Sequence, residues 1–348
     1  MTTPITTPTP PAAPAYLSDI RREPESLQDQ LDSRLEPDAL AMLRRLHGFD
    51  RIVLTGMGAS LHALYPVFLT LASAGLPVWQ VETSELLGEA DGLVTTRTLL
   101  WITSQSGRSA EVAALLERTS ARHPAVLGFT NDTNSPLAEA SDALVELHSG
   151  PEHAVGTRSY VNSLAAHARA TAVVLERELP GDLSEAPSRL AEYLGRWDEH
   201  VAAWEAAVSE QILFAVARGA SLAAARTGAL IIKEAAKTPI EAMSAPQFRH
   251  GPLEMADERL CVIVLPGGPA DAPLNERLAA DLAAFGANAV TLRLPGADHA
   301  PELPRLSSED ARPLAEILPF QILSVVLAER LGYEPGAFRQ IEKVTTTL

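Results

Sequence analysis

The sequence predicts an α/β protein in which parallel sheets are covered by helices on both faces. Apolar runs of strand length alternate with longer segments of helical period, and the runs lack the polar alternation that an exposed face would impose. In the first half these runs are RIVLT (51–55), PVWQV (77–81), TLLWI (98–102), AVLGF (125–129) and ALVEL (143–147). Such strands, separated by helices, are typical of the doubly wound class.

The same pattern starts again in the second half of the chain. Residues 157 to about 210 are almost wholly helical in composition, broken only by LPGD at 179–182. Further strands are expected at 212–217, 261–265 and 289–294, with helices from 221, around 273–285 and near 313–331. The segment that is rich in helix formers would therefore link two α/β domains.

A short internal repeat supports this duplication. GASL occurs at 58–61 and again at 219–222, each time after an apolar strand and before a helix. The same interval from the two copies leads to Ser104 and to Leu265, and both lie at predicted strand ends. Only the first copy carries hydroxyl groups there.

We expect four segments along the chain. Residues 1–16 are dense in Thr and Pro and are predicted to be a disordered tail. An N-terminal helix and the first domain would occupy 17–180, and a linker helix and the second domain 186–335. A C-terminal tail at 336–348 completes the chain.

Composition narrows the classes of function. The 348 residues are 46% hydrophobic and carry a formal net charge of −16, which argues against nucleic acid or an anionic membrane as partner. Neither a signal peptide nor a long apolar span is evident, so a soluble cytoplasmic protein is expected. The single cysteine, Cys261, is predicted to be a buried thiol. The motifs of dinucleotide, ATP or GTP sites and of metal ligation are missing, so no cofactor and no metal are expected.

The stretch TSQSGRS at 103–109 has the features of an anion site. It follows a buried strand, and the segment after it is a good helix with Ser109 or Ser106 as the expected N-cap. The helix would point free N–H groups at the crevice beyond the sheet, and Gly107 permits close backbone approach. The hydroxyls of Ser104, Ser106 and Ser109 and the amide of Gln105 are then placed to hold one phosphate.

A second turn, GMGAS at 56–60, has similar features. Its glycines allow a tight turn from strand to helix, and Gly58 and Ser60 would face the same anion. Serines and glycines are common in ordinary loops, so either stretch alone is weak evidence. Two such turns in one domain favour a phosphate site.

These motifs resemble the SIS (sugar isomerase) domain family, whose members bind phosphosugars in flavodoxin-like domains. The resemblance covers roughly 45–348 and implies two tandem SIS domains. Its most specific piece, GALIIKEAAKTPIEAMSAPQFRHGPLEM at 228–255, resembles the isomerase half of glucosamine-6-phosphate synthase. The terminal EKVTTTL is closer to SIS-type glucosamine-6-phosphate deaminases.

The resemblance implies a role for each matching residue. Glu234 takes the position of the carboxylate that moves a proton between sugar carbons 1 and 2. His250 takes that of the imidazole that assists ring opening, which in a homodimer can come from the second subunit. Lys343 takes that of the lysine that forms a Schiff base with the open-chain ketose. Phosphate-binding positions fall on Gly58, Ser60, Ser104, Gln105, Ser106 and Ser109, and substrate-lining positions on Ala59, Val155, Gly156 and Thr157.

The sequence also departs from the family pattern. Ile231 stands where a lysine usually precedes the glutamate by one helical turn, and Ala59 replaces a Ser or Thr. GPEHAVGTRSY at 150–160 is one residue shorter than the family motif and has Arg158 in place of Lys. A glutaminase domain is missing, so ammonia transfer from glutamine is not expected.

The leading expectation is an enzyme that converts glucosamine 6-phosphate to fructose 6-phosphate and ammonia. An aldose–ketose isomerase and a deglycase for fructosamine phosphates remain open, and so does a non-catalytic phosphosugar sensor. Without the resemblance, Glu234 reads as a solvated helix carboxylate, His250 as a structural histidine in a turn and Lys343 as a mobile surface charge.

Overall fold

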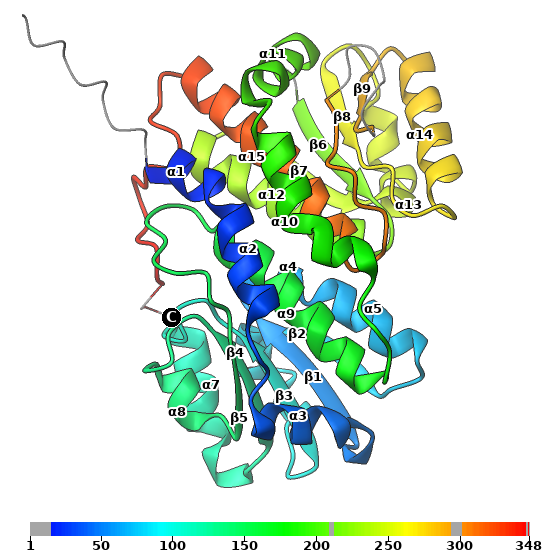
Figure 1. The fold of residues 1–348 in the computed structure, drawn as a ribbon. Helices are drawn as coiled ribbons and strands as arrows, with labels where there is room; N and C mark the ends of the chain where they lie inside the picture. Colours follow the sequence, from blue (N-terminus) through cyan, green and yellow to red (C-terminus); the bar gives the residue numbers. More distant parts are fainter. Residues whose placement is uncertain (1–14, 209–211, 294–300, 346, 348) are drawn as a thin grey trace, which may run out of the picture.

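The computed structural model of the chain describes residues 15–208, 212–293, 301–345 and 347, which form two parallel sheets flanked by helices (Figure 1). The first sheet has the order β2-β1-β3-β4-β5, and the second has the order β7-β6-β8-β9. All neighbouring strands run parallel. The strands are β1 (Arg51–Gly56), β2 (Val78–Glu82), β3 (Thr98–Thr103), β4 (Ala125–Thr130), β5 (Ala143–Glu146), β6 (Ile212–Ala217), β7 (Ile240–Ser244), β8 (Leu260–Val264) and β9 (Asn288–Thr291).

This topology confirms the predicted fold class of two tandem α/β domains. Both sheets begin with the same strand order, in which the second strand lies outside the first and the third lies on its other side. The predicted strands are found to within one to three residues at each end. The pattern did not reveal β7, an edge strand of sequence IEAMS in which only Ile240 is buried.

The helices cover both faces of each sheet and join the two domains. The helices are α1 (Ala15–Arg21), α2 (Glu23–Asp32), α3 (Pro37–Arg44), α4 (Gly58–Ala63), α5 (Tyr65–Ser73), α6 (Thr83–Leu86), α7 (Ala110–Thr119), α8 (Pro136–Ala140), α9 (Arg158–Val174), α10 (Gly181–Leu194), α11 (Trp197–Ala207), α12 (Ser221–Ala236), α13 (Ala245–Arg249), α14 (Ala272–Ala284) and α15 (Arg312–Arg330). Helices α9, α10 and α11 confirm the helical segment expected between the domains. No helix of the described segments is long and apolar enough to cross a membrane.

Close packing of apolar side chains fixes the core. In the first sheet, Trp101 stacks on Phe129 of the next strand with ring centroids 5.0 Å apart. In the second domain, Gly228 of α12 faces Phe320 of α15, and a Cβ at this glycine would overlap the ring. The predicted burial of Cys261 is confirmed.

The N-terminal helices differ from the expectation in two ways. Residues 1–14 of the expected tail lie outside the described residues, but Ala15 and Tyr16 already belong to α1. Tyr16 is only 1% exposed, and its hydroxyl lies 2.9 Å from Ser324 Oγ on α15. The boundary at residue 16 is therefore wrong, because a distant partner buries this tyrosine. The N-terminal helices also pack on the second domain, not only on the first.

The internal repeat corresponds to a structural equivalence. Gly58 follows β1 with φ +52°, and Gly219 follows β6 with φ +54°. This left-handed backbone favours glycine at both places. Ser104 and Leu265 each directly follow the third strand of their sheet, so the two strand ends are counterparts.

Candidate active site

The phosphate-loop candidate is the turn from β3 to α7. The hydroxyl of Ser104 accepts the N–H of Gly107, and that of Ser106 accepts the N–H of Arg108, both at 3.2 Å. Gly107 has φ +61°, and a Cβ there would overlap Ser135, so no other residue fits without distortion. These contacts fold the loop into a compact turn at the N-terminus of α7.

The remaining loop residues lie as the sequence predicts. Ser109 is the N-cap residue of α7, but its hydroxyl makes no capping hydrogen bond. Gln105 and Ser106 are half-buried, and Ser104 is buried at the strand end. The first N–H groups of a helix have no acceptor within the helix, so this turn offers donors to an anion.

The second turn, GMGAS, lies beside the first because β1 and β3 are neighbouring strands. A Cβ at Gly56 would lie 2.7 Å from the carbonyl oxygen of Thr103, which shows how closely the two turns approach. Ser60 lies in α4 and is half-buried. Helix α4 in turn contacts α12 of the second domain, where His62 Nδ1 lies 3.3 Å from Thr227 Oγ1.

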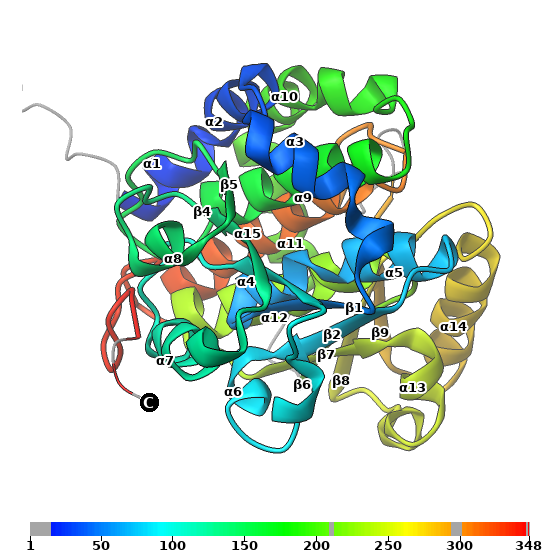
Figure 2. The same ribbon diagram turned by 90° about the horizontal axis from the view of Figure 1, so that it is seen from below.

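The C-terminal tail crosses from the second domain to this loop. The carbonyl of Thr345 accepts the N–H of Ala110, the first residue of α7, at 3.0 Å. Lys343 Nζ donates to Glu152 Oε2 at 3.0 Å and to the carbonyl of Ala154 at 2.8 Å. Figures 1 and 2 both show the C-terminus beside α7. A lysine six positions from the end is thus held in a defined place.

Glu152 organises the loop between β5 and α9, and the sequence reasoning assigned it no role. Its carboxylate accepts the N–H and hydroxyl of Thr157, at 2.8 and 3.0 Å, and the N–H and hydroxyl of Ser159, at 3.2 and 2.8 Å. Lys343 is its fifth donor. Its place in the motif GPEHAVGTRSY was the available signal, because a buried carboxylate requires such partners.

The four predicted substrate-lining residues have different surroundings. Val155 and Thr157 are buried, and Gly156 and Ala59 are half-buried. Both donors of Thr157 are used by Glu152, so this residue supports the loop. Contact of any of the four with a substrate remains a prediction.

Arg158, which replaces the family lysine, is a structural anchor. It is buried, and its guanidinium pairs with Asp19 of α1 at 2.7 Å and donates to the carbonyl of Ser149 at 2.9 Å. The loop that holds Glu152 is therefore tied to the N-terminal helix.

Glu234 lies near the end of α12 and is partly buried. Burial raises its pKa to about 7, while the ammonium groups of Lys237 and Lys343 act in the opposite direction. The influence of Lys343 shows that the carboxyl and the tail amine share one neighbourhood. Ile231, one turn earlier, is 1% exposed and packs in the apolar core. The second domain thus brings Glu234 towards Lys343 but offers no cation at position 231.

His250 lies apart from these groups within one chain. Its residue is exposed at the end of α13, and both views show α13 on the side of the molecule away from the C-terminus. No hydrogen bond or ion pair among the described residues ties its ring to Glu234 or Lys343. The structure therefore gathers the other predicted catalytic residues and the phosphate loop, but not this histidine.

Within 15–208, 212–293, 301–345 and 347, no group of three or more His, Cys, Asp or Glu residues is arranged to hold a metal ion.

Comparison with known sequences shows what this fold belongs to. The SIS domain model matches residues 45–175 and 208–293, more than half of the chain. Glutamine–fructose-6-phosphate aminotransferase (isomerizing) of Pyrococcus horikoshii is 28% identical over 349 residues, covering 95% of this chain. The corresponding protein of Mycolicibacterium smegmatis is 26% identical over 360 residues. The chain spans 57% of the length of each of these relatives.

Solved structures share the whole fold. The C-terminal domain of glucosamine-fructose-6-phosphate aminotransferase from Francisella tularensis superposes with a TM-score of 0.81 at 19% identity, covering 95% of this chain and 99% of that one. Glucosamine-6-phosphate deaminase from Thermotoga maritima gives 0.77 at 19% identity, with the same coverage. Tagatose-6-phosphate ketose/aldose isomerase from Escherichia coli gives 0.78 at 19%, covering 96% and 97%. The family match, supported by this shared fold, shows that the chain belongs to the SIS domain family.

Proposed function

We propose that the protein acts on a phosphorylated hexosamine, and that it converts glucosamine 6-phosphate and water into fructose 6-phosphate and ammonia. One observation carries the proposal: the tail of the second domain delivers the amine of Lys343 to the loop beside the hydroxyl-rich turn of the first domain. The proposed phosphate-binding turn and the amine of Lys343 therefore lie on the same side of the molecule.

The phosphate would bind at the N-terminus of α7. Ser104, Gln105, Ser106 and Ser109 surround this turn, with Ser60 on the adjacent one. Hydroxyl and N–H donors suit a phosphate because each of its oxygens accepts hydrogen bonds. Such a local grip works despite the overall negative charge of the chain.

Glu234 would transfer the proton between carbon 2 and carbon 1 of the open-chain sugar. A carboxyl whose pKa is about 7 is suited to both removing and returning a proton near neutral pH. The transfer turns the 2-amino aldehyde into an imine at carbon 2.

Lys343 would then replace ammonia at carbon 2. Its amine attacks the imine carbon, ammonia leaves, and water hydrolyses the resulting Schiff base to the ketone, which frees the lysine. The ammonium must first lose a proton, and Glu152, 3.0 Å away, is placed to accept it.

The names of the similar proteins support this substrate class. The curated relatives are named for an amino-group transfer on fructose 6-phosphate, and the solved structures include a deaminase of glucosamine 6-phosphate and a ketose/aldose isomerase. The buried Ile231 supplies no cation one helical turn before Glu234, which favours a plain aldose–ketose isomerase as the second candidate function.

The assay is release of ammonia and ketose from hexosamine 6-phosphates. We expect both products from glucosamine 6-phosphate, and a loss of about 100-fold or more in kcat for Glu234→Gln with substrate binding kept. The control is Glu241→Gln, an exposed carboxylate on β7. Ketose from glucose 6-phosphate without ammonia from any amino sugar would instead identify an isomerase. Binding without turnover of either substrate would identify a sensor.

We also propose that His250 serves the site of a second subunit, because one chain leaves it distant. Mixing two inactive variants, Glu234→Gln and His250→Ala, tests this directly. If the dimer shares its sites, half of the randomly mixed dimers are hybrids with one intact site, which restores about a quarter of the wild-type activity. If both residues act within one chain, mixing restores nothing.

A further inference from the structure

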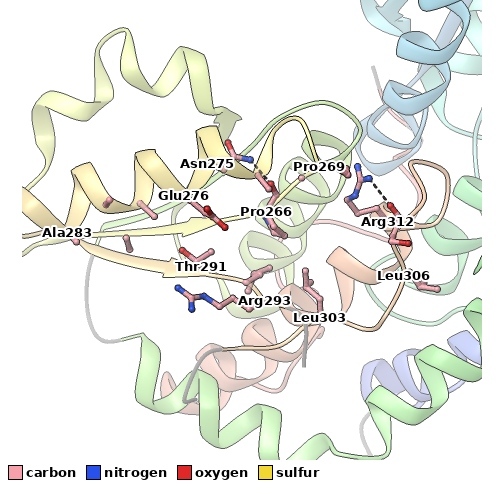
Figure 3. Close-up of a pocket in the computed structure, with 18 residues that line it drawn as sticks. Pro266, Pro269, Asn275, Glu276, Ala283, Thr291, Arg293, Leu303, Leu306 and Arg312 are labelled. Carbon is pink, nitrogen blue, oxygen red and sulfur yellow. Dashed lines mark hydrogen bonds between the residues drawn. The ribbon is translucent and has the colours of Figure 1, made fainter. Parts of the chain in front are cut away.

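We propose that the second domain contains a separate binding site for a small organic oxyanion, a phosphate monoester or a carboxylate that also bears hydroxyl groups. The site is a cavity of about 860 Å³ at the carboxyl ends of β8 and β9, between α14 and the start of α15 (Figure 3). This volume is typical of pockets that take small molecules. The proposal goes beyond the enzymatic site and does not depend on it.

The position within the fold favours ligand binding. In open parallel sheets, ligands bind beyond the carboxyl ends of the strands. The cavity is lined by Pro266, Gly267 and Gly268, which belong to LPGG, the counterpart of SQSG in the first domain. The turn itself is occupied, because the carboxylate of Asp271 packs against Gly219 and Gly267. The open space lies beside this turn.

Arg312 provides the cation at one end of the cavity. It is only 7% exposed, and its guanidinium lies against Gly268, where an added Cβ would be 3.2 Å from Nη1. It donates one hydrogen bond, from Nη2 to the carbonyl of Ser307 at 2.9 Å, which Figure 3 shows as a dashed line.

This arginine has no ion-pair partner within 4 Å among the described residues. Glu316, one helical turn further along α15, interacts electrostatically with Arg312, but burial raises the pKa of this carboxyl to about 8. A buried guanidinium is costly unless paired and hydrogen-bonded. Arg312 lines the cavity, where an oxyanion would complete its pairing.

The other residues that line the cavity suit a ligand that carries several hydroxyl groups. Alanines of α14 and Leu303 and Leu306 form an apolar wall. Glu276 of α14 and Thr291 of β9 also line the cavity, where a carboxylate and a hydroxyl suit the hydroxyl groups of a ligand. Asn275 is already committed, because it bonds Arg218 and the carbonyls of Leu265 and Pro266.

The test uses the full chain with Ser104→Ala and Ser106→Ala, which weakens the phosphate grip of the first domain. Titration calorimetry with glucose 6-phosphate and with gluconate measures the remaining binding, and glucose serves as the ligand without an anionic group. We expect one equivalent of glucose 6-phosphate or of gluconate to bind per chain, and glucose not to bind. Heat of binding with glucose 6-phosphate would indicate a phosphate site, and heat of binding with gluconate would indicate a carboxylate site.

Two further substitutions in this background locate the binding. Ala280→Phe fills the cavity from an exposed position of α14 and should abolish it, whereas Ala284→Phe, on the same helix but outside the lining, should not. Arg312→Met should weaken binding at least about tenfold. The proposal is overturned if neither anion binds, or if binding persists in Ala280→Phe. An inactive protein that still shows this binding would refute only the enzymatic proposal.

Discussion

The two domains place a glycine-containing turn at equivalent strand ends and equip it differently: the left-handed glycine is Gly107 in the first turn and Gly267, one position earlier, in the second. Both turns pair with a left-handed glycine, Gly58 in one domain and Gly219 in the other. In the first, the N-cap of α7 is Ser109; in the second, the N-cap of α14 is Asp271. Asp271 Oδ2 lies 3.3 Å from where a Cβ of Gly219 would be, so the second turn already holds a negative charge. The two turns thus differ at the N-cap, where the first has a neutral hydroxyl and the second a carboxyl group.

The C-terminal tail is a second difference between the two turns. In the first domain, the N–H of Ala110 is used by the carbonyl of Thr345, which comes from the far end of the chain. In the second domain, the N–H of the corresponding Ala272 bonds the local carbonyl of Gly268. Among the described residues, the first turn is thus hydrogen-bonded to the C-terminal tail, whereas the equivalent N–H of the second turn is bonded locally.

The largest effect should come from a Cβ at the first turn. Gly107→Ala forces a left-handed backbone on alanine and an overlap with Ser135, which should cost roughly 2 to 4 kcal/mol of folding free energy and abolish sugar-phosphate binding. Thermal unfolding and calorimetric titration measure the two effects.

The comparison substitution is Gly268→Ala, which lies at the equivalent sequence position of the second turn but lacks the left-handed φ of Gly107. Its added Cβ meets only the flexible end of Arg312, at 3.2 Å, so we expect a cost under about 1 kcal/mol and unchanged turnover. Equal losses at the two glycines would contradict the proposed division of roles.

A smaller loss is expected when the tail amine loses its carboxylate. Glu152→Gln removes the negative charge that faces all five donors, and with the amide nitrogen in place of Oε2, Lys343 and the hydroxyl of Ser159 also lose their acceptor. We expect kcat to fall by about 10²-fold, with a much smaller change in KM. Glu146→Gln, on the neighbouring strand and partly exposed, is the control. A change in KM alone would assign Glu152 to binding instead.

The pH dependence of turnover tests Glu234. Since the base must be deprotonated and its pKa is about 7, kcat should rise by about tenfold per pH unit below 7 and level off above it. The residual kcat of Glu234→Gln should not show this rise between pH 5 and 7. A limb near pH 4.5 would mean that the carboxyl is solvated during the reaction.

The smallest effect concerns Glu316, a buried carboxyl of the second domain that we assign no catalytic role. Its pKa of about 8 in the folded chain lies above the ordinary value, so the folded state keeps a proton that the unfolded state loses. Stability should therefore fall as the pH rises from about 4.5 to 8. Glu316→Gln should remove this fall and stabilise the protein by about 1 kcal/mol at pH 8, with turnover unchanged. Denaturant titration at the two pH values measures it, and Glu329→Gln on the same helix is the control.

The sequence was sufficient for the parts of the fold that depend on local pattern. Buried strands such as TLLWI contain an uninterrupted apolar run, and the repeat of GASL led to equivalent turns. The edge strand β7 was not predicted because four of its five residues are not buried. The N-terminal helix was predicted, but its start was placed two residues late because the burial of Tyr16 depends on Ser324, 308 residues away.

The candidate site also has parts that the local sequence predicts and parts that depend on contacts between distant residues. The phosphate loop was predicted because its residues are contiguous and their spacing alone indicates an anion turn. The position of Glu152 beside Lys343 joins residues 191 apart in the chain, and no local pattern contains it. The separation of Glu234 from His250 within one chain also became visible only in three dimensions.

Asp19 in the first helix binds the guanidinium of Arg158 with one oxygen and the backbone N–H of His153, at 3.0 Å, with the other. His153 is the residue next to Glu152, which holds the tail amine. The opening helix and the closing tail of the polypeptide therefore converge on one short loop, so that shortening the protein at its beginning would disturb chemistry that is encoded at its end.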